Sequence, residues 1–430
     1  MRRGDIIDYL KEYEKFQPEL IERELKVPLD SKFIISIIGP RRAGKTYYLF
    51  QLSRKVKNYL YLNFEDSRLY DLKPKDLREV IRISIEIYGK EPDYLFLDEV
   101  QNLKGWEIIV RELHDLEKYK IFLTGSSSKL LSKEIATQLR GRTLSYLLLP
   151  FSFREFLKAK KIKIEEHLSK DEVAKIRHYL KEYLEFGGFP DVVLNEQKIK
   201  ILKEYADLIL FRDFIERHKI KNIGLARFLH SFIIQNFSKE ISVNSLFKKL
   251  RSTGLKVSKN TLYSYISKLE DTSFFFFLRK YSIKPHLREL YPKKIYLCDT
   301  GLTKVVKYSE DIGKLMENVV FLELLRLRNE NPLIEVFYWK DYQQREVDFV
   351  LKEGEKIKEL IQVTYELTPE NEKREVNSLI RASKELGCEN LKILTWNQSE
   401  LLRKDGKKIS IMPLWRWLIE KCAQFKPISF

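Results

Sequence analysis

Cysteine, glycine and proline are scarce in this sequence, which contains 3 Cys, 16 Gly and 13 Pro among 430 residues. The three cysteines lie far apart, and no Cys-x-x-Cys or His-x-x-x-His pair is present. We therefore do not expect a disulfide framework or a structural zinc site. The low glycine and proline content also argues against long flexible linkers, so we expect domains that follow one another closely.

Long apolar runs are absent as well. No stretch approaches the roughly 18 apolar residues that cross a bilayer, and the first 16 residues contain two arginines but no apolar core. We therefore expect a cytoplasmic protein that does not insert into a membrane.

The composition that remains is typical of a folded protein, with 44% hydrophobic, 13% aromatic and 33% charged residues. A chain of 430 residues suggests two or three domains. Its 79 Lys and Arg against 62 Asp and Glu give a net charge of +17. Such an excess favours a polyanionic partner, either nucleic acid or an acidic membrane face.

Residues 1–150 have the pattern of an α/β domain. An amphipathic leader helix is expected within residues 1–30, with a scaffolding role. Short apolar runs then alternate with helical stretches: FIISIIG, YLYLNF, YLFLDEV, KIFLTGS and LSYLLLPF. Apolar runs of this kind are typical of strands buried on both faces of a parallel sheet, so we predict a doubly wound parallel sheet.

The rest of the chain divides into three predicted parts. Residues 151–220 are expected to form a helical lid subdomain. Residues 221–305 read as helices followed by a β-ribbon, the order of a winged helix. Residues 306–430 read as a second, smaller α/β domain. Residues 221–290 contain 13 Lys or Arg and 4 Asp or Glu, a local excess of 9, so the basic charge is concentrated there.

A phosphate-binding motif follows the first predicted strand. Residues 39–46, GPRRAGKT, match G-x-x-x-x-G-K-[ST] between a strand and a helix, which predicts a P-loop that binds ATP and Mg²⁺. Lys45 would contact the β- and γ-phosphates, and the Thr46 hydroxyl would hold Mg²⁺. The residues predicted to surround the nucleotide are Gly39, Pro40, Arg41, Arg42, Ala43, Gly44, Lys45 and Thr46.

Two acidic residues end the predicted strand YLFLDE. Asp98 is expected to hold Mg²⁺, and Glu99 is expected to orient or deprotonate the attacking water.

Two further polar features of this domain leave alternatives open. The hydroxyl groups after strand KIFLTGS, on Ser126 and Ser127, could sense the γ-phosphate or simply cap the next helix. Arg140 and Arg142 could act as an arginine finger on a neighbouring subunit, or could interact with a helix carboxyl end.

The order of motifs resembles the AAA-type P-loop ATPases of bacteria and archaea that carry a winged helix and a C-terminal restriction-endonuclease-like domain. The resemblance extends over nearly the whole chain and includes GPRRAGKT, LDEVQN, TGSSS, LRGRT, GGFP, CDTGL, MENVVFLEL and EVDFVL. It implies metal binding and water activation by Asp98 and Glu99 and a sensor at Ser126 or Ser127. It also makes Arg212 a possible second sensor at the nucleotide.

The basic module is expected to bind DNA. Ser258 would open a recognition helix whose buried stripe is Leu262, Ile266 and Leu269. The residues expected to face nucleic acid are Lys256, Lys259, Tyr263 and Lys268. The alternative is a winged helix that only packs between domains.

The last domain carries an incomplete nuclease pattern. Glu317 and Asp348 resemble the acidic residues of restriction-endonuclease-like nucleases, but the expected Glu-x-Lys is replaced by Gln362-Val363-Thr364. The catalytic lysine is then missing, unless Lys340 or Lys358 supplies it. We expect a degenerate domain rather than an active nuclease.

Together these features predict an Mg²⁺-dependent ATPase that couples ATP hydrolysis to DNA binding or remodelling, with branched DNA or strand ends as candidate substrates. A finger supplied by a neighbour implies a homo-oligomer. The alternative is a nucleotide-controlled switch that docks a protein partner.

Overall fold

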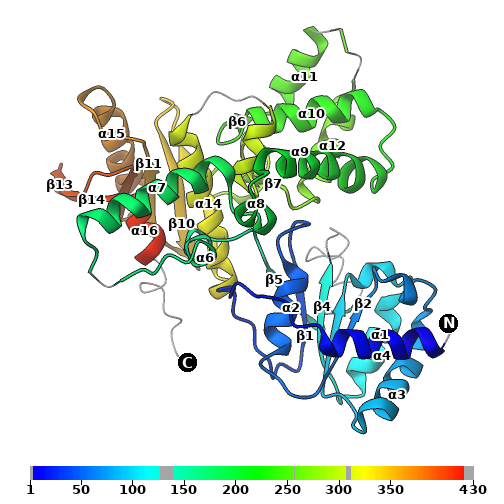
Figure 1. The fold of residues 1–430 in the computed structure, drawn as a ribbon. Helices are drawn as coiled ribbons and strands as arrows, with labels where there is room; N and C mark the ends of the chain where they lie inside the picture. The colour runs from blue at the N-terminus through cyan, green and yellow to red at the C-terminus, as the bar shows by residue number, and fades with distance from the viewer. Residues whose placement is uncertain are drawn as a thin grey trace. The chain divides into compact units, whose positions relative to one another are not determined.

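The computed structural model describes residues 3–125, 139–165, 167–252, 254–255, 257–306 and 311–420. The chain divides into two compact units, Met1–Pro150 and Phe151–Phe430 (Figure 1). Among the described residues, no helix is both long enough and apolar enough to cross a membrane.

The first unit is built on a five-stranded sheet in which every pairing is parallel, in the order β2-β3-β4-β1-β5. Its strands are β1 (Ile34–Ile38), β2 (Tyr59–Asn63), β3 (Tyr94–Asp98), β4 (Lys120–Gly125) and β5 (Thr143–Leu147). Its helices are α1 (Arg3–Lys15), α2 (Lys45–Ser53), α3 (Leu77–Tyr88) and α4 (Trp106–Asp115), with short 3₁₀ turns η1 (Ser67–Leu69), η2 (Pro74–Asp76) and η3 (Val100–Asn102). The parallel sheet is the predicted one, although the strand predicted over residues 144–151 ends at Leu147.

Alternation along the strands places apolar side chains on both faces of this sheet. Ile34 and Ile38 belong to one apolar cluster, with residues of α1, α3 and α4. Ile35 and Ile37 belong to another, with residues of α2. Burial on both faces explains why the strands read as continuous apolar runs.

The second unit begins with helices that the sequence predicts over residues 151–220. They are α6 (Phe153–Ala159), α7 (Lys170–Phe186), α8 (Pro190–Leu194), α9 (Lys198–Leu208) and the π-helical segment η5 (Ile209–Glu216). Next come α10 (Ile223–Gln235), α11 (Val243–Ser252) and α12 (Lys259–Glu270), with α13 (Pro285–Arg288) and η6 (Thr300–Val306) farther along the chain. The strands β6 (Glu240–Ile241), β7 (Phe275–Leu278) and β8 (Lys293–Leu297) form an antiparallel sheet in the order β6-β8-β7.

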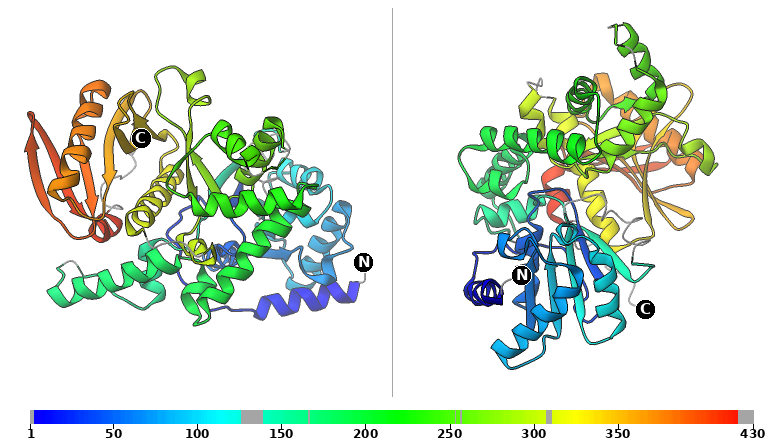
Figure 2. Two further views of the ribbon diagram at one scale, coloured as in Figure 1. Left: turned by 90° about the horizontal axis from the view of Figure 1, so that it is seen from above. Right: turned by 90° about the vertical axis from the view of Figure 1, so that its right-hand side faces the viewer.

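A mixed six-stranded sheet completes the second unit, in the order β13-β14-β12-β11-β10-β9. Its strands are β9 (Ile334–Lys340), β10 (Glu346–Glu353), β11 (Lys356–Val363), β12 (Leu391–Thr395), β13 (Glu400–Lys404) and β14 (Lys407–Pro413). The helices of this region are α14 (Ile312–Glu330), α15 (Pro369–Leu386) and α16 (Leu414–Glu420), and Figure 2 shows them in yellow, orange and red. The sequence analysis predicts no element over residues 400–420, where β13, β14 and α16 lie.

Helices α14 and α15 pack on different faces of this sheet. Val350 belongs to the apolar cluster that includes Leu379 of α15. The ring of its neighbour Phe349 lies 6.4 Å from that of Phe321 on α14. The pairing of β10 with β9 shifts register between Val347 and Val350. Such a bulge re-aims the side chains within it, and Asp348 is one of them.

Two of the segments noted in the sequence, GGFP at residues 187–190 and CDTGL at residues 298–302, contact each other in the second unit. The buried Asp299 carboxylate accepts hydrogen bonds from the N–H groups of Gly188, at 2.6 Å, and Gly301, at 2.8 Å. A Cβ on Gly187 would lie 1.6 Å from Asp299 Oδ1, so this position requires glycine. Burial raises the pKa of Asp299 to about 7. These hydrogen bonds of Asp299 with Gly188 and Gly301, here called the clasp, join the segment after α7 to the segment after β8.

Candidate nucleotide site

The loop between β1 and α2 has the backbone of a phosphate cradle. Gly39 has a φ of 147°, and a Cβ there would lie 2.1 Å from the carbonyl oxygen of Leu148, so only glycine fits. Arg42 and Gly44 also have positive φ, at 64° and 90°. Turns of this kind direct successive backbone N–H groups toward one point, and the start of α2 adds its dipole.

Lys45 is 4% exposed and lies against this loop. Its Nζ donates hydrogen bonds to the carbonyl oxygens of Gly39, at 3.2 Å, and Pro40, at 3.0 Å. The ammonium is thus held at the cradle, where a phosphate would compete with the carbonyls.

Arg23, which the sequence analysis did not select, fixes the far side of the loop. Its guanidinium donates to the carbonyl oxygens of Ala43, at 2.7 Å, and Leu149, at 2.6 Å. The side chain of Gln51 in turn bonds both the N–H and the carbonyl of Arg23. The contacts join the segment before β1 to the cradle, and no local motif marks an arginine for this role.

Asp98 is fully buried at the end of β3, where three hydroxyl groups meet its carboxylate. Tyr61 Oη donates to Oδ2 at 2.8 Å, and Thr124 Oγ1 donates to Oδ1. The Thr46 hydroxyl also hydrogen-bonds Asp98. Burial, together with the charge of Glu99, raises the pKa of Asp98. The hydroxyl and the carboxylate predicted to hold Mg²⁺ therefore lie close enough for the Thr46 hydroxyl to lower the pKa of Asp98.

Glu99 follows in the left-handed region, with a φ of 49°. Its N–H donates to Thr124 Oγ1 at 2.9 Å, and Gln101 Nε2 donates to its Oε2. Thr124 thus contacts both acidic residues from the neighbouring strand β4. The sequence placed the polar sensor at Ser126 or Ser127, and both lie outside the described residues.

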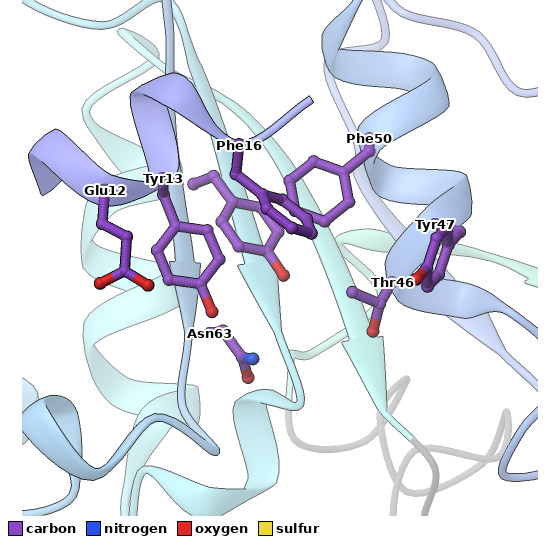
Figure 3. A pocket seen from close by; sticks show the side chains of 8 residues that line it. Glu12, Tyr13, Phe16, Thr46, Tyr47, Phe50 and Asn63 are labelled. Carbon is purple, nitrogen blue, oxygen red and sulfur yellow. The ribbon is translucent and has the colours of Figure 1, made fainter. Parts of the chain in front are cut away.

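A pocket of about 180 Å³ lies beside Thr46 (Figure 3). It is lined by Glu12, Tyr13, Phe16, Thr46, Tyr47, Phe50, Tyr61 and Asn63. The ring of Tyr61 lies 4.6 Å from that of Phe50 and 5.2 Å from that of Tyr13. The leader helix α1, expected to be a scaffold, therefore also lines a cavity next to the P-loop, and Tyr61 connects this cavity to Asp98.

The three candidate arginines lie in different places. Arg142 forms a bidentate ion pair with Asp115, at 2.9 and 3.2 Å, and its carbonyl accepts the N–H of Ile34. It therefore lies where β1 and β5 begin, whereas the P-loop lies where β1 ends. Arg140 is exposed nearby with a φ of 51°. Arg212 is exposed on η5 in the second unit. A catalytic role for any of them stays a prediction.

A basic groove lies between α11 and the start of α12. It encloses about 660 Å³ and is lined by Asn244, Phe247, Lys248, Arg251, Ser252 and Lys259. Lys259 Nζ and the Arg251 guanidinium lie 5.5 and 5.7 Å from the centre of the Phe247 ring. Of these residues only Lys259 was predicted from the sequence, and its neighbours on α11 were not.

The other predicted residues of this module are less close together. Tyr263 is 55% exposed, and Lys268 lies over the ring of Tyr265 at 6.0 Å. Lys256 lies outside the described residues. The predicted buried stripe of α12 was wrong at one position, because Tyr265 is buried where Ile266 was expected.

The predicted nuclease-like residues meet in the second unit, around a lysine that the sequence analysis missed. Lys294 of β8 contacts both Glu317 and Asp348, and Gln362 accepts the N–H of Asp348 at 3.3 Å. Lys358 is not the missing lysine, since it pairs with Glu353 at 2.8 Å. Lys340 bonds Glu240 at 2.9 Å and reaches Glu346 at 3.3 Å. Among the described residues, no group of His, Cys, Asp and Glu has the arrangement of a metal site.

Comparisons with known proteins cover most of the chain. Residues 31–157 match the family described as AAA domain. Residues 177–311 and 312–417 match two domains of unknown function, DUF8612 and DUF4143.

Two relatives match over most of their length. The uncharacterized protein MJ1544 of Methanocaldococcus jannaschii is 40% identical over 413 residues, which cover 93% of this chain and 91% of that protein. An uncharacterized protein of Haemophilus influenzae is 30% identical over 354 residues, covering 80% and 84%. Among solved structures, the Walker-type ATPase PABY2304 of Pyrococcus abyssi is 13% identical, covers 71% of this chain and 94% of that chain, and has a TM-score of 0.41.

Proposed function

The chain belongs to the same AAA-domain family as MJ1544 of M. jannaschii and its relative in H. influenzae, and we propose that it is an Mg²⁺-dependent ATPase that couples ATP hydrolysis to DNA binding or remodelling. One observation carries the ATPase proposal. The glycine-lined loop opens helix α2 at Lys45 and Thr46, and the Thr46 hydroxyl lies close enough to the buried Asp98 carboxylate to lower its pKa. A phosphate cradle and a pair of hard oxygen ligands thus lie side by side, as Mg²⁺ with a nucleotide requires.

Each residue of the site then has a separate task. The N–H groups between Gly39 and Thr46 would bind the phosphates, and Lys45 would exchange its loop carbonyls for phosphate oxygens. Thr46 and Asp98 would hold Mg²⁺, which neutralises charge on the phosphates. Glu99, aimed by its contact with Thr124, would orient the attacking water.

The DNA part of the proposal rests on the basic groove of α11 and α12. We infer that α10 to α12 and β6 to β8 form a winged-helix module. The cations of Lys248, Arg251 and Lys259 would contact phosphates, and the Phe247 ring would support those of Arg251 and Lys259. Phosphate contacts of this kind bind DNA without reading its sequence, so recognition would depend on DNA shape, and branched DNA or strand ends are the forms to test.

A homo-oligomer is part of the same proposal. Arg142 lies at the end of the sheet where β1 and β5 begin, whereas its own P-loop lies where β1 ends. Arg142 could therefore complete a site only on a neighbouring subunit, and only by leaving Asp115. Mass measurement with and without ATP, on wild type and Arg142→Ala, tests this. A wild type that stays monomeric with ATP and Mg²⁺ would contradict it.

The decisive experiment measures the ATPase rate without DNA and with single-stranded, duplex and four-way-junction DNA. Lys45→Ala should lose ATP binding, whereas Glu99→Gln should bind ATP but hydrolyse it at least about 100-fold more slowly. Lys55→Ala, an exposed lysine on the same unit, is the matched control and should behave as wild type. Equal ATP binding by Lys45→Ala would refute the proposed site.

The DNA surface needs its own test. Replacing Lys248, Arg251 and Lys259 by glutamine should weaken duplex binding and lower the slope of log K against log salt by about 3. A parallel variant of Lys259 and Lys268 tests the residues selected from sequence. Unchanged affinity and slope in both variants would remove DNA binding from the proposal.

A second candidate function is a nucleotide-controlled switch that docks a protein. The segment between β7 and β8 exposes Ile283, at 82%, and Leu290, at 77%, and large exposed apolar side chains favour protein contacts. A motor on DNA should hydrolyse ATP severalfold faster when DNA is added. A switch should ignore DNA and respond to a protein partner, with a response that Ile283→Ser and Leu290→Ser remove.

A further inference from the structure

A buried lysine lies at the centre of the nuclease-like acidic cluster. Lys294 is 2% exposed, and its ammonium lies 2.9 Å from Glu317 Oε1, 2.6 Å from Glu346 Oε1 and 2.8 Å from Asp348 Oδ1. These carboxylates come from α14 and β10, whereas Lys294 comes from β8, in the preceding sheet. One cation therefore joins elements that are separated in sequence.

Carboxylates surround the ammonium. It donates hydrogen bonds to Glu317 Oε1 and Asp348 Oδ1, and it forms an ion pair with Glu346 Oε1 at 2.6 Å. Burial alone would lower the pKa of Lys294, but attraction to Asp348 and Glu317 raises it well above its ordinary value, so the group stays charged. Its position and charge are those of a permanently bound cation.

The oxygens of the cluster are engaged as well. Asp348 Oδ2 accepts the N–H of Val363 at 2.9 Å, and Glu317 Oε1 also accepts the hydroxyl of Tyr296 at 2.6 Å. Gln362, where a nuclease would carry a ligating carboxylate, donates to Glu375 at 2.6 Å. A divalent cation would have to displace these partners and lie against the ammonium, which like-charge repulsion opposes.

We propose that the ammonium of Lys294 is the resident cation of this cluster, in the place that a divalent metal ion would occupy in a nuclease. The cluster then binds no catalytic metal, and the domain does not cut DNA. The role of the cluster is structural, because the ion pairs of Lys294 hold β8 against α14 and β10. The proposal does not depend on ATP hydrolysis, since these residues all lie in the second unit.

A different role for Lys294 would be that of a nuclease lysine which supports the attacking water. Such a lysine needs a donor directed at water, whereas the Lys294 ammonium donates to two carboxylates and is ion-paired with a third. The two roles predict opposite behaviour toward metal ions, so metal binding decides between them.

The test is Mn²⁺ binding, followed by electron paramagnetic resonance, to the full-length protein without nucleotide. Wild type and Asp348→Asn should bind the same number of Mn²⁺ ions, because the cluster binds none in either. Lys294→Ala should bind one more ion than wild type, and Lys294→Ala with Asp348→Asn should lose it. Any Mn²⁺ at the P-loop is common to all four proteins and cancels.

Thermal unfolding provides the second measurement. Lys294→Ala leaves the buried carboxylates of Glu317 and Asp348 without their cation, whereas Glu346 keeps Lys340 at 3.3 Å. The substitution should lower the Tm by roughly 5–15 °C, and Mn²⁺ should restore part of this loss. If Lys294→Ala does not fold, the comparison of wild type with Asp348→Asn still decides the question.

Three results would overturn the proposal. One is an Mn²⁺ ion in wild type that Asp348→Asn removes. Another is Mg²⁺- or Mn²⁺-dependent DNA cleavage by wild type that Lys294→Ala abolishes. The third is a folded Lys294→Ala that binds no additional Mn²⁺, which would mean that the acids do not form a cation site.

Discussion

Replacing Thr124 by valine should slow ATP hydrolysis while leaving ATP binding nearly unchanged. Thr124 Oγ1 donates to Asp98 and accepts the N–H of Glu99 at 2.9 Å, so one hydroxyl links the two acidic residues of the site. Valine has almost the same shape and keeps the packing of β4. The substitution therefore removes the hydroxyl and little else.

The size of the effect follows from the lost hydrogen bonds. A hydrogen bond to a charged group contributes about 1.5–3 kcal/mol, and the buried N–H of Glu99 would also lose its acceptor. If that contribution is lost where Glu99 must orient water, kcat should fall roughly 10- to 150-fold, at 1.36 kcal/mol for each tenfold. The KM for ATP should change less than about threefold, because Lys45 and the loop N–H groups are untouched.

Steady-state kinetics of wild type, Thr124→Val and Thr124→Ser would check this. Serine retains the hydroxyl and should recover most of the rate, and a Tm for each variant shows whether it is folded. A Thr124→Val enzyme with kcat within twofold of wild type, or one whose defect lies entirely in KM, would refute a positioning role for Thr124.

Three further predictions concern the cradle, the clasp and a buried histidine. Gly39→Ala should abolish binding of a fluorescent ATP analogue, because its Cβ would lie 2.1 Å from the carbonyl oxygen of Leu148; binding within threefold of wild type would contradict the cradle geometry. Asp299→Ala leaves the N–H groups of Gly188 and Gly301 without their acceptor and should lower stability in urea by roughly 2–5 kcal/mol, so a loss below about 1 kcal/mol would argue against the clasp. Burial lowers the pKa of His230 to about 4, so the unfolded chain binds the proton first and the stability that His230 contributes above pH 6.5 is lost as the pH falls toward 4. Relative to His230→Phe, wild type should lose roughly 2–3 kcal/mol between pH 7.5 and 4.5 in urea titrations, and parallel pH profiles would exclude this role.

The features that the sequence determined are those encoded in one continuous segment. The P-loop was predictable because eight consecutive residues supply the turns, the N–H groups and Lys45. Asp98 and Glu99 were predictable because an apolar strand ends in two acids. The parallel sheet followed from apolar runs that only burial on both faces explains.

The fold of the last domain was predictable in part. The sequence predicted an α/β domain over residues 306–430 but no helix or strand over residues 400–420, although side chains of β14 alternate between buried and more exposed positions. The stripe of α12 shows the same limit, since an aromatic residue with a polar tip, Tyr265, replaced the expected Ile266 in the interior.

Only the tertiary structure decided which side chains meet across elements. Thr124 and Tyr61 reach Asp98 from neighbouring strands, and Arg23 reaches the P-loop from the segment before β1. No motif in the sequence marks Lys294, which shares a strand face with Tyr296. Its partners lie 23 to 54 residues away along the chain. A charge in a sequence shows neither its burial nor its partners, because both depend on packing between elements distant in the chain.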